Sequence, residues 1–315
     1  IKDAAGNNAT LTLASPGASG SLGANKALVI DGVVPTVSNV TSTTSDGTLK
    51  VGDVAAITIT FTEAVTVSGT PQLTLETGSS DAVVNYASGS GSTTLTFYYS
   101  VAAGHVSSDL DYASTSALAL NSGTINDASG NAATLTLASP GASGSLGANK
   151  ALVLDGVVAT VSSVTSTTAD GSYKINTTIP IKVTFSEAVY VTGTPQITLE
   201  TGSSDAVVNY TSGSGSADLI FNYTVASGQT SSDLDYTSTS ALALNSGTIK
   251  DVVGNTSTLT LASPGGTNSL GANKALIIDT TVPTVASVTS TSSDGSYKVG
   301  DVIPIKITFS EAVTV

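Results

Sequence analysis

The chain has 315 residues, 23 acidic side chains, 10 lysines and no arginine, which gives a formal net charge of −13. This acidity excludes a basic surface for nucleic acid, and the absence of cysteine excludes disulfides and thiol chemistry. The apolar content of 40% favours a folded chain over a disordered one. No stretch approaches the roughly 20 apolar residues of a membrane helix. No signal peptide is recognisable, so we expect a window of a longer protein.

The sequence repeats itself without insertions or deletions. The segment SLGANKAL begins at Ser21, Ser145 and Ser269, a spacing of 124 residues. Each repeat is joined to the next by an apolar strand that ends at an aspartate and restarts after a short joint. The expected organisation is the last part of a repeat at 1–32, complete repeats at 33–156 and 157–280, and the first part of another at 281–315.

The first complete repeat is dense in strand signals. Apolar and polar residues alternate in 54–61 and again in 93–101, as in a strand with one buried face. Turn signals of glycine, serine, aspartate and proline separate these runs, and no helical periodicity is present. Eight or nine short antiparallel strands in one repeat predict an all-β protein made of tandem immunoglobulin-like β-sandwich domains in an end-to-end array.

The direction of successive strands predicts which loops share an end of a repeat. The first strand leaves the joint and the second returns to it, so Glu63 is expected beside the joint, together with SSDLDY (107–112). A strand from Ser116 to Ile125 would end at the loop 126–131. That loop is therefore expected at the opposite end, next to Asp155 and the following repeat.

This count predicts three groups of carboxylates, one at each junction between repeats. Each group is expected to bind Ca²⁺. Crowded carboxylates repel one another without a counter-ion, and Ca²⁺ takes six to eight oxygen ligands in flexible geometry. Mg²⁺ is less suited because it keeps its water, and transition metals would need histidine or cysteine. The predicted ligands are Asp3, Asp31, Glu63, Asp109 and Asp111 at the first junction, Asp127, Asp155, Glu187, Asp233 and Asp235 at the second, and Asp251, Asp279 and Glu311 at the third.

Simpler roles remain open for several of these residues. The junction aspartates could cap turns or be solvated charge, and Asp127 with Asn131 could form an Asx-turn that only closes a loop. Tyr112 and its copy Tyr236 occupy the place of a tyrosine corner. His105 is the only histidine, and the next repeat has Gln229 in its place, which argues against catalysis.

The repeats resemble the bacterial Ig-like tandem repeats of giant surface adhesins. The resemblance covers the whole chain and rests on the D-T-T-x-P joint (279–283), GDxIxIxxTFSEAV (300–313), SSDLDY, GTIxDxxGN (247–255) and SLGANKAL. It implies a secreted or cell-surface protein that commonly holds Ca²⁺ near domain junctions, as cadherins also do. Pro35 is replaced by Ala159, and DTT becomes DGV at the first two joints, which leaves the acids in place.

We therefore expect a non-enzymatic, extracellular stalk or fibre segment of an adhesin, rigidified by Ca²⁺ at its junctions. Its partners would be neighbouring repeats of the same chain, with a host or matrix ligand bound outside this window. We expect no nucleic acid and no membrane insertion in this window. Two alternatives are a self-associating subunit of an extracellular filament or layer, and a module that binds glycans or matrix through exposed loops.

Overall fold

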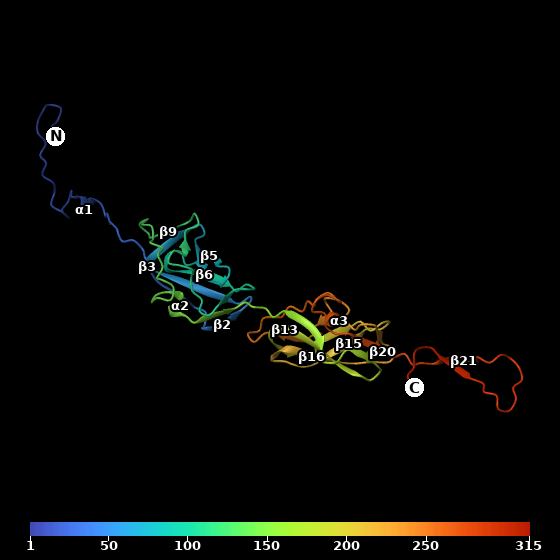
Figure 1. The fold of residues 1–315 in the computed structure, drawn as a ribbon. Coiled ribbons are helices and arrows are strands. Elements are labelled where there is room, and N and C mark those ends of the chain that lie inside the picture. Colours follow the sequence, from blue (N-terminus) through green and yellow to red (C-terminus); the bar gives the residue numbers. More distant parts are fainter. The chain divides into compact units, whose positions relative to one another are not determined.

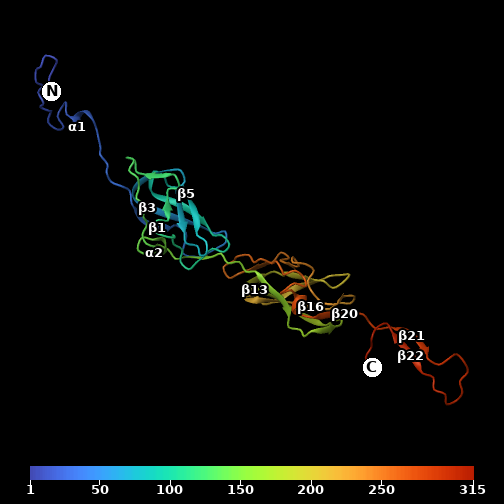
Figure 2. The ribbon, with the colours of Figure 1, turned by 45° about the horizontal axis from the view of Figure 1, so that its top comes forward.

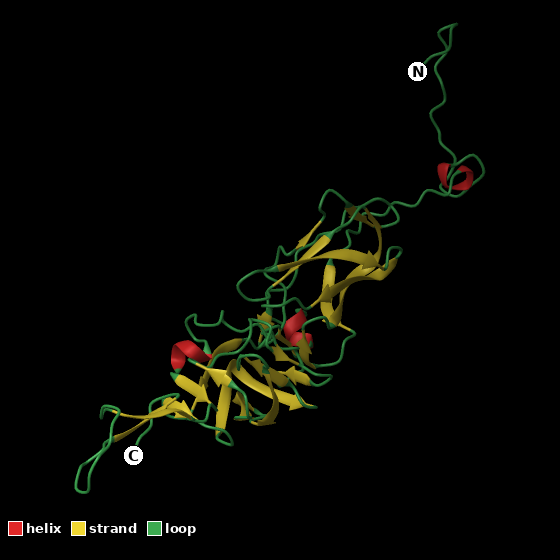
Figure 3. Ribbon diagram, turned by 90° about the vertical axis from the view of Figure 1, so that its right-hand side faces the viewer, coloured by secondary structure: helices red, strands yellow, loops and turns green.

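The computed structural model describes residues 1–315 and consists of strands and turns with three short helices (Figures 1 and 3). The helices are copies of one LGAN segment, and in each a preceding serine accepts a hydrogen bond from the alanine amide. None is long and apolar enough to cross a membrane. They are α1 (Leu22–Asn25), α2 (Leu146–Asn149) and α3 (Leu270–Asn273).

The chain divides into two similar all-β units, Ile1–Asp155 and Gly156–Val315. Unit 1 contains a curled, mainly antiparallel sheet of seven strands in the order β1-β3-β6-β5-β4-β8, with β9 paired to β3 (Figure 2). A separate mixed sheet has the order β2-β10-β7. The strands are β1 (Val37–Ser42), β2 (Gly47–Lys50), β3 (Val54–Ser68), β4 (Gln72–Leu75), β5 (Ala82–Ser88), β6 (Ser92–Ser100), β7 (Val106–Ser107), β8 (Leu118–Ala119), β9 (Thr124–Asn126) and β10 (Leu152–Asp155).

Unit 2 repeats this arrangement, with sheets in the orders β11-β13-β16-β15-β14-β18 and β12-β20-β17, and β19 paired to β13. Two further strands, β21 and β22, form a separate pair. The strands are β11 (Val161–Ser166), β12 (Gly171–Tyr173), β13 (Thr178–Thr192), β14 (Gln196–Leu199), β15 (Ala206–Ser212), β16 (Ser216–Thr224), β17 (Thr230–Ser231), β18 (Leu242–Ala243), β19 (Thr248–Lys250), β20 (Leu276–Asp279), β21 (Val285–Ser290) and β22 (Ile305–Phe309).

The core of each unit is built from aliphatic residues that alternate along these strands. Ile57 and Ile59 on β3 pack with Leu95 and Phe97 on β6, and all four are fully buried. Burying each such side chain contributes roughly 1.5–3 kcal/mol relative to leaving it exposed. The period-two pattern thus selects the face of the sheet that turns inward.

The first and last segments of the chain lack this packing. Residues 1–34 contain α1 but no strand. Leu13 is 90% exposed, whereas its copy Leu137 in unit 1 is 3% exposed. Ile307 on β22 is 52% exposed, whereas its copy Val183 on β13 is fully buried. The same sequence is therefore packed only where the rest of a repeat surrounds it.

The predicted all-β class is confirmed, as is the presence of two similar tandem units. The structure shows curled antiparallel sheets with small mixed sheets beside them. The finer immunoglobulin-like sandwich arrangement, and the domain limits at 32, 156 and 280, stay predictions.

Tyr112 binds the glycine-rich segment that leads to α2 through a hydrogen bond to its backbone. Its ring is buried, and its hydroxyl donates a 2.6 Å hydrogen bond to the backbone oxygen of Ala138. Burial, with a smaller effect of the Asp111 carboxylate, raises the pKa of Tyr112 to about 12. The hydroxyl therefore stays protonated and able to donate. Tyr236 makes the same bond to Ala262 in unit 2.

Replacing Tyr112 by phenylalanine should lower the free energy of unfolding of unit 1 by about 1–2 kcal/mol. The ring is kept, but the partly buried Ala138 carbonyl loses its donor. Urea unfolding of the whole chain measures this change, with Tyr98→Phe as the control because Tyr98 is 56% exposed. Equal midpoints for Tyr112→Phe and the unmodified chain would show that the bond adds no stability.

Candidate metal site

Glu63 lies where the long strand β3 departs from regular pairing. β3 pairs with β6 up to Thr60↔Thr94 and again at Val65↔Ser92, with a shift of register between them. Such bulges redirect side chains and often occur next to functional sites. The Oε1 atom of Glu63 is buried and has no hydrogen-bond partner. An unpartnered buried carboxylate oxygen is costly unless a donor or a cation meets it.

Asp127 begins the loop that follows β9 and is only 6% exposed. Its Oδ1 accepts from the amides of Ser129 (2.9 Å) and Asn131 (2.8 Å), and its Oδ2 accepts from the Asn131 side chain (2.7 Å). Burial alone would raise the pKa of Asp127. The hydrogen bonds from Asn131, Ser129 and Gly130 outweigh it and lower the pKa, so the carboxylate stays ionised.

Asp31 belongs to the joint that precedes the first complete repeat, and the Asp127 loop is bonded to it. The Ser129 hydroxyl donates to Asp31 Oδ2 at 3.0 Å. The Asn131 side chain donates to the backbone oxygens of Asp31 (3.2 Å) and Val33 (3.3 Å). Ser129 and Asn131 therefore position the Asp31 carboxylate close to Asp127.

Together these residues form what we call the acidic cluster: Asp31, Glu63 and Asp127. Each offers one carboxylate oxygen, and the three oxygens lie within 4.8 Å of one another. None of the chain's four ion pairs involves these residues. Three carboxylates at this distance form a possible metal-binding group.

The electrostatics of the acidic cluster act most strongly on Glu63. Desolvation raises the pKa of Glu63 above its ordinary value of 4.5, and the charges of Asp31 and Asp127 raise it further. Without a cation the cluster therefore favours protonation of Glu63. A bound cation would reverse the preference and hold all three carboxylates ionised.

The predicted position of the loop 126–131 beside Asp155 was wrong. Asp155 pairs with Lys50 and Val106, and Lys50 lies just before the first residue of β3. In contrast, β9 pairs with the last three residues of β3, at the opposite end of this long strand. Figure 1 accordingly labels β9 and β2 at different ends of unit 1. The loop therefore meets the joint before its own repeat.

The physical reason is an extra turn. We expected one strand from Ser116 to Ile125, but β8 and β9 are separate and the chain reverses between them. Asn121 and Ser122 adopt φ values of 46° and 64°, in the left-handed region. One reversal more than expected moves Asp127 to the end that holds Glu63.

Asp109 and Asp111 were also expected beside Glu63, and they lie elsewhere. The Asp111 carboxylate accepts from the amides of Tyr112 and Gly141, each at 2.9 Å. A Cβ added to Gly147 in α2 would lie 3.0 Å from Asp111 Oδ2 and 3.4 Å from Asp109 Oδ2. Both aspartates thus face α2. Their copies in unit 2 face α3 in the same way, and these are Asp233 and Asp235, against Gly271.

Asp3, the copy of Asp127, was expected with Asp31 but is not part of the acidic cluster. It closes its own exposed loop by accepting from Ala5 and from both nitrogens of Asn7. These bonds, with the Asn7 side chain first, lower the pKa of Asp3. The extra turn explains this difference too. A loop of this kind lies beside the joint that precedes its own repeat, whereas Asp31 belongs to the joint that follows the repeat of Asp3.

Asp251 was expected with Asp279 and Glu311 but lies with the start of unit 2. It is 3% exposed and accepts from the Asn255 side chain, which also donates to the backbone oxygen of Val157. Asp279 and Glu311 do share a pocket of about 280 Å³, and Glu311 Oε1 is buried without a partner. Asp155 ends β10. Glu187 lies in β13, within the register shift between Thr184 and Val189.

Sequence comparisons add no assignment to this geometry. No protein-family model matches the chain, and no curated protein is similar enough to match it.

Replacing Glu63 by glutamine should stabilise the protein when a chelator removes divalent cations. A raised pKa in the folded state means that folded Glu63 binds a proton more readily than unfolded Glu63. Stability attributable to this residue is therefore present at acid pH and lost as the pH rises above about 4.5.

Thermal unfolding in chelator should show Glu63→Gln melting above the unmodified chain, with a gap that widens from pH 4 to pH 7. Glu76→Gln is the matched control, because Glu76 is an exposed glutamate outside the acidic cluster. Equal melting temperatures at pH 7 would show that water screens the repulsion on the Glu63 carboxylate, so that its ionisation does not destabilise the folded chain.

Proposed function

We propose that the chain is a stalk segment of a repetitive bacterial cell-surface or secreted adhesin, and that Ca²⁺ at the junctions between repeats rigidifies it. One observation carries the proposal: the acidic cluster brings together carboxylates from both sides of the joint that follows Asp31. Asp31 precedes the joint, whereas Glu63 and Asp127 follow it. A cation held by all three would link the two repeats.

The chemistry of the acidic cluster favours Ca²⁺ among common cations. Its ligand atoms are carboxylate oxygens, and backbone oxygens of the Asp31–Val33 joint lie nearby, as the bonds from Asn131 indicate. Hard oxygen ligands in flexible geometry suit Ca²⁺, whereas Mg²⁺ demands near-ideal octahedral geometry. No histidine or cysteine is present in the cluster to select a transition metal.

A stalk follows from the repetition of these acids. By the 124-residue period the positions of Asp31, Glu63 and Asp127 recur as Asp155, Glu187 and Asp251. A cation that binds only the aligned joint stabilises that joint by mass action, by about 2.7 kcal/mol at a hundredfold excess over its Kd. Extracellular modules bind Ca²⁺ with Kd values of roughly 10⁻⁴ to 10⁻³ M, which suits a protein outside the cell.

Calorimetric titration of the whole chain with Ca²⁺ should show binding with a Kd on the order of 10⁻⁴ M. Glu63→Gln should remove one binding site and part of the calcium-induced rise in melting temperature, because it deletes one of the three carboxylates. Glu76→Gln should bind as the unmodified chain does.

Small-angle scattering of the same samples tests the stalk. The particle should be longer and less variable in Ca²⁺ than in chelator. Equal scattering and equal melting in the two conditions would mean that the carboxylates are solvated charge. Growth of the particle mass with concentration would instead support the self-associating filament.

A further inference from the structure

Asp46 and Lys150 have no part in the acidic cluster, yet every copy of their segments retains them. Aspartate recurs at 46, 170 and 294, and lysine at 26, 150 and 274. In unit 1 Lys150 Nζ lies 2.8 Å from Asp46 Oδ1, and in unit 2 Lys274 lies 2.8 Å from Asp170. The Lys150 hydrogen bond, with a further bond from the Ala151 amide, lowers the pKa of Asp46.

This ion pair stands at the first rung of a parallel ladder. β2 and β10 pair in parallel, from Gly47↔Leu152 to Lys50↔Asp155. The Gly47 amide donates to Ala151 O at 3.0 Å, and the Ala151 amide donates back to Asp46 Oδ1 at 3.3 Å. Unit 2 builds the same ladder between β12 and β20.

In each complete repeat the ladder joins an early strand to the last strand. β2 is the second strand of unit 1 and β10 is its last, and the two run in the same direction. Tension applied at both ends of the unit pulls β2 backward from its first residue and β10 forward from its last. The strands then slide along each other, so all rungs and the ion pair are loaded together.

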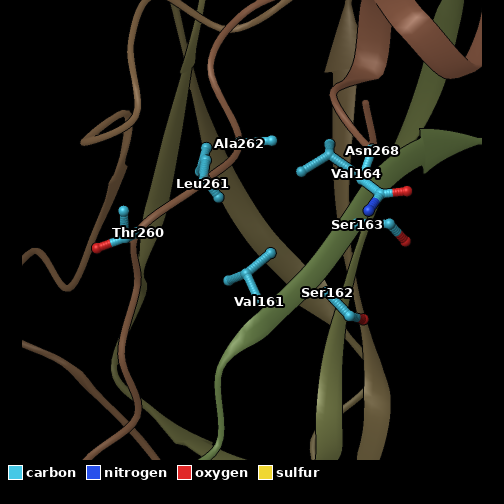
Figure 4. Close-up of a pocket in the computed structure, with 8 residues that line it drawn as sticks. All are labelled: Val161, Ser162, Ser163, Val164, Thr260, Leu261, Ala262 and Asn268. Atoms are coloured by element: carbon cyan, nitrogen blue, oxygen red, sulfur yellow. The ribbon is translucent and has the colours of Figure 1, made fainter. Parts of the chain in front are cut away.

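The other parallel contact between early and late segments is interrupted. In unit 2, Thr258 N donates to Ala159 O just before β11, and Val164 N, within β11, donates to Asn268 O. Between these bonds a pocket of about 280 Å³ separates β11 from residues 260–262 (Figure 4). This contact offers isolated bonds, whereas β12 and β20 offer a continuous ladder.

We propose that each unit carries a load-bearing clamp, made of the parallel β2–β10 ladder and the Asp46–Lys150 ion pair, that resists unfolding under end-to-end tension. In unit 2 the clamp is the β12–β20 ladder with Asp170 and Lys274. This role rests on the proposed stalk, because only a chain that connects two anchored points experiences such tension. It gives a function to the retained aspartate and lysine that the acidic cluster leaves unexplained.

Single-molecule pulling of the whole chain by its two ends tests the clamp. Lys150→Met together with Lys274→Met should unfold roughly two- to fivefold faster at constant load, the effect of losing a partly exposed ion pair. Lys182→Met is the control, because its 3.1 Å ion pair with Asp218 joins β13 to β16 and lies outside the ladder. Equal rates for the double variant and the control would overturn the proposal.

The direction of pulling gives a second test that does not depend on any variant's stability. The chain has no cysteine, so handles can be attached at introduced cysteines alone. Ser45→Cys and Ala148→Cys place handles at exposed positions near the same end of β2 and β10. Pulling there separates the rungs one at a time and should need a smaller force than end-to-end pulling. An equal or larger force would exclude a clamp that works by sliding strands.

The clamp and the calcium stalk can fail separately. End-to-end pulling in chelator should leave the sensitivity of the unfolding force to the lysine variants unchanged, because Asp46, Lys150, Asp170 and Lys274 are not among the proposed calcium ligands. If the chain does not bind calcium but the lysine variants still unfold faster than the control, only the calcium junction is rejected. A missing force difference with intact calcium binding would reject only the clamp.

Discussion

The hydrogen-bond ladder of one long strand, β3, is the constraint on which the rest of unit 1 depends. It pairs with β1 on one side, with β6 on the other, and with β9 after its bulge. The regular part of β3 supplies the fully buried isoleucines of the core. The irregular part positions Glu63, and the last part draws β9 and Asp127 toward it. A single strand thus connects packing to chemistry.

Without a bound cation, the acidic cluster lowers the stability of the folded chain. Glu63 is held beside two carboxylates with a buried oxygen that nothing satisfies. The cost is consistent with a site preorganised for a cation, because the loop from Asp127 to Asn131 is already bonded to the joint. Little rearrangement would be needed when a cation binds. Most of the binding free energy would therefore stabilise the joint between the repeats.

The sequence was a sound guide to the repeat and the strand content, because period-two alternation in runs such as 54–61 depends only on local residues. It also selected Asp31, Glu63 and Asp127 as candidate metal ligands, and the structure brings these three carboxylates together, but the sequence count assigned Asp127 to the wrong junction. That assignment depended on counting reversals, and the Asn121–Gly123 turn was counted as strand. The signal was available, since asparagine, serine and glycine in succession are typical of a turn. The small mixed sheet could not be foreseen, because its four-residue ladder joins segments about a hundred residues apart.

The parallel β2–β10 ladder also dictates the order in which a repeat can fold. Its partners are separated by 105 residues at the Ala151–Asp46 bond, so the contact order of the unit is high and its last strand must close it. While a chain is being synthesised, each repeat therefore stays open until nearly all of it has emerged. The next repeat then brings an almost identical last strand, LIID in place of LVLD, which is a competent substitute. Exchange of this strand between neighbouring repeats is therefore the expected misfolding route for such an array.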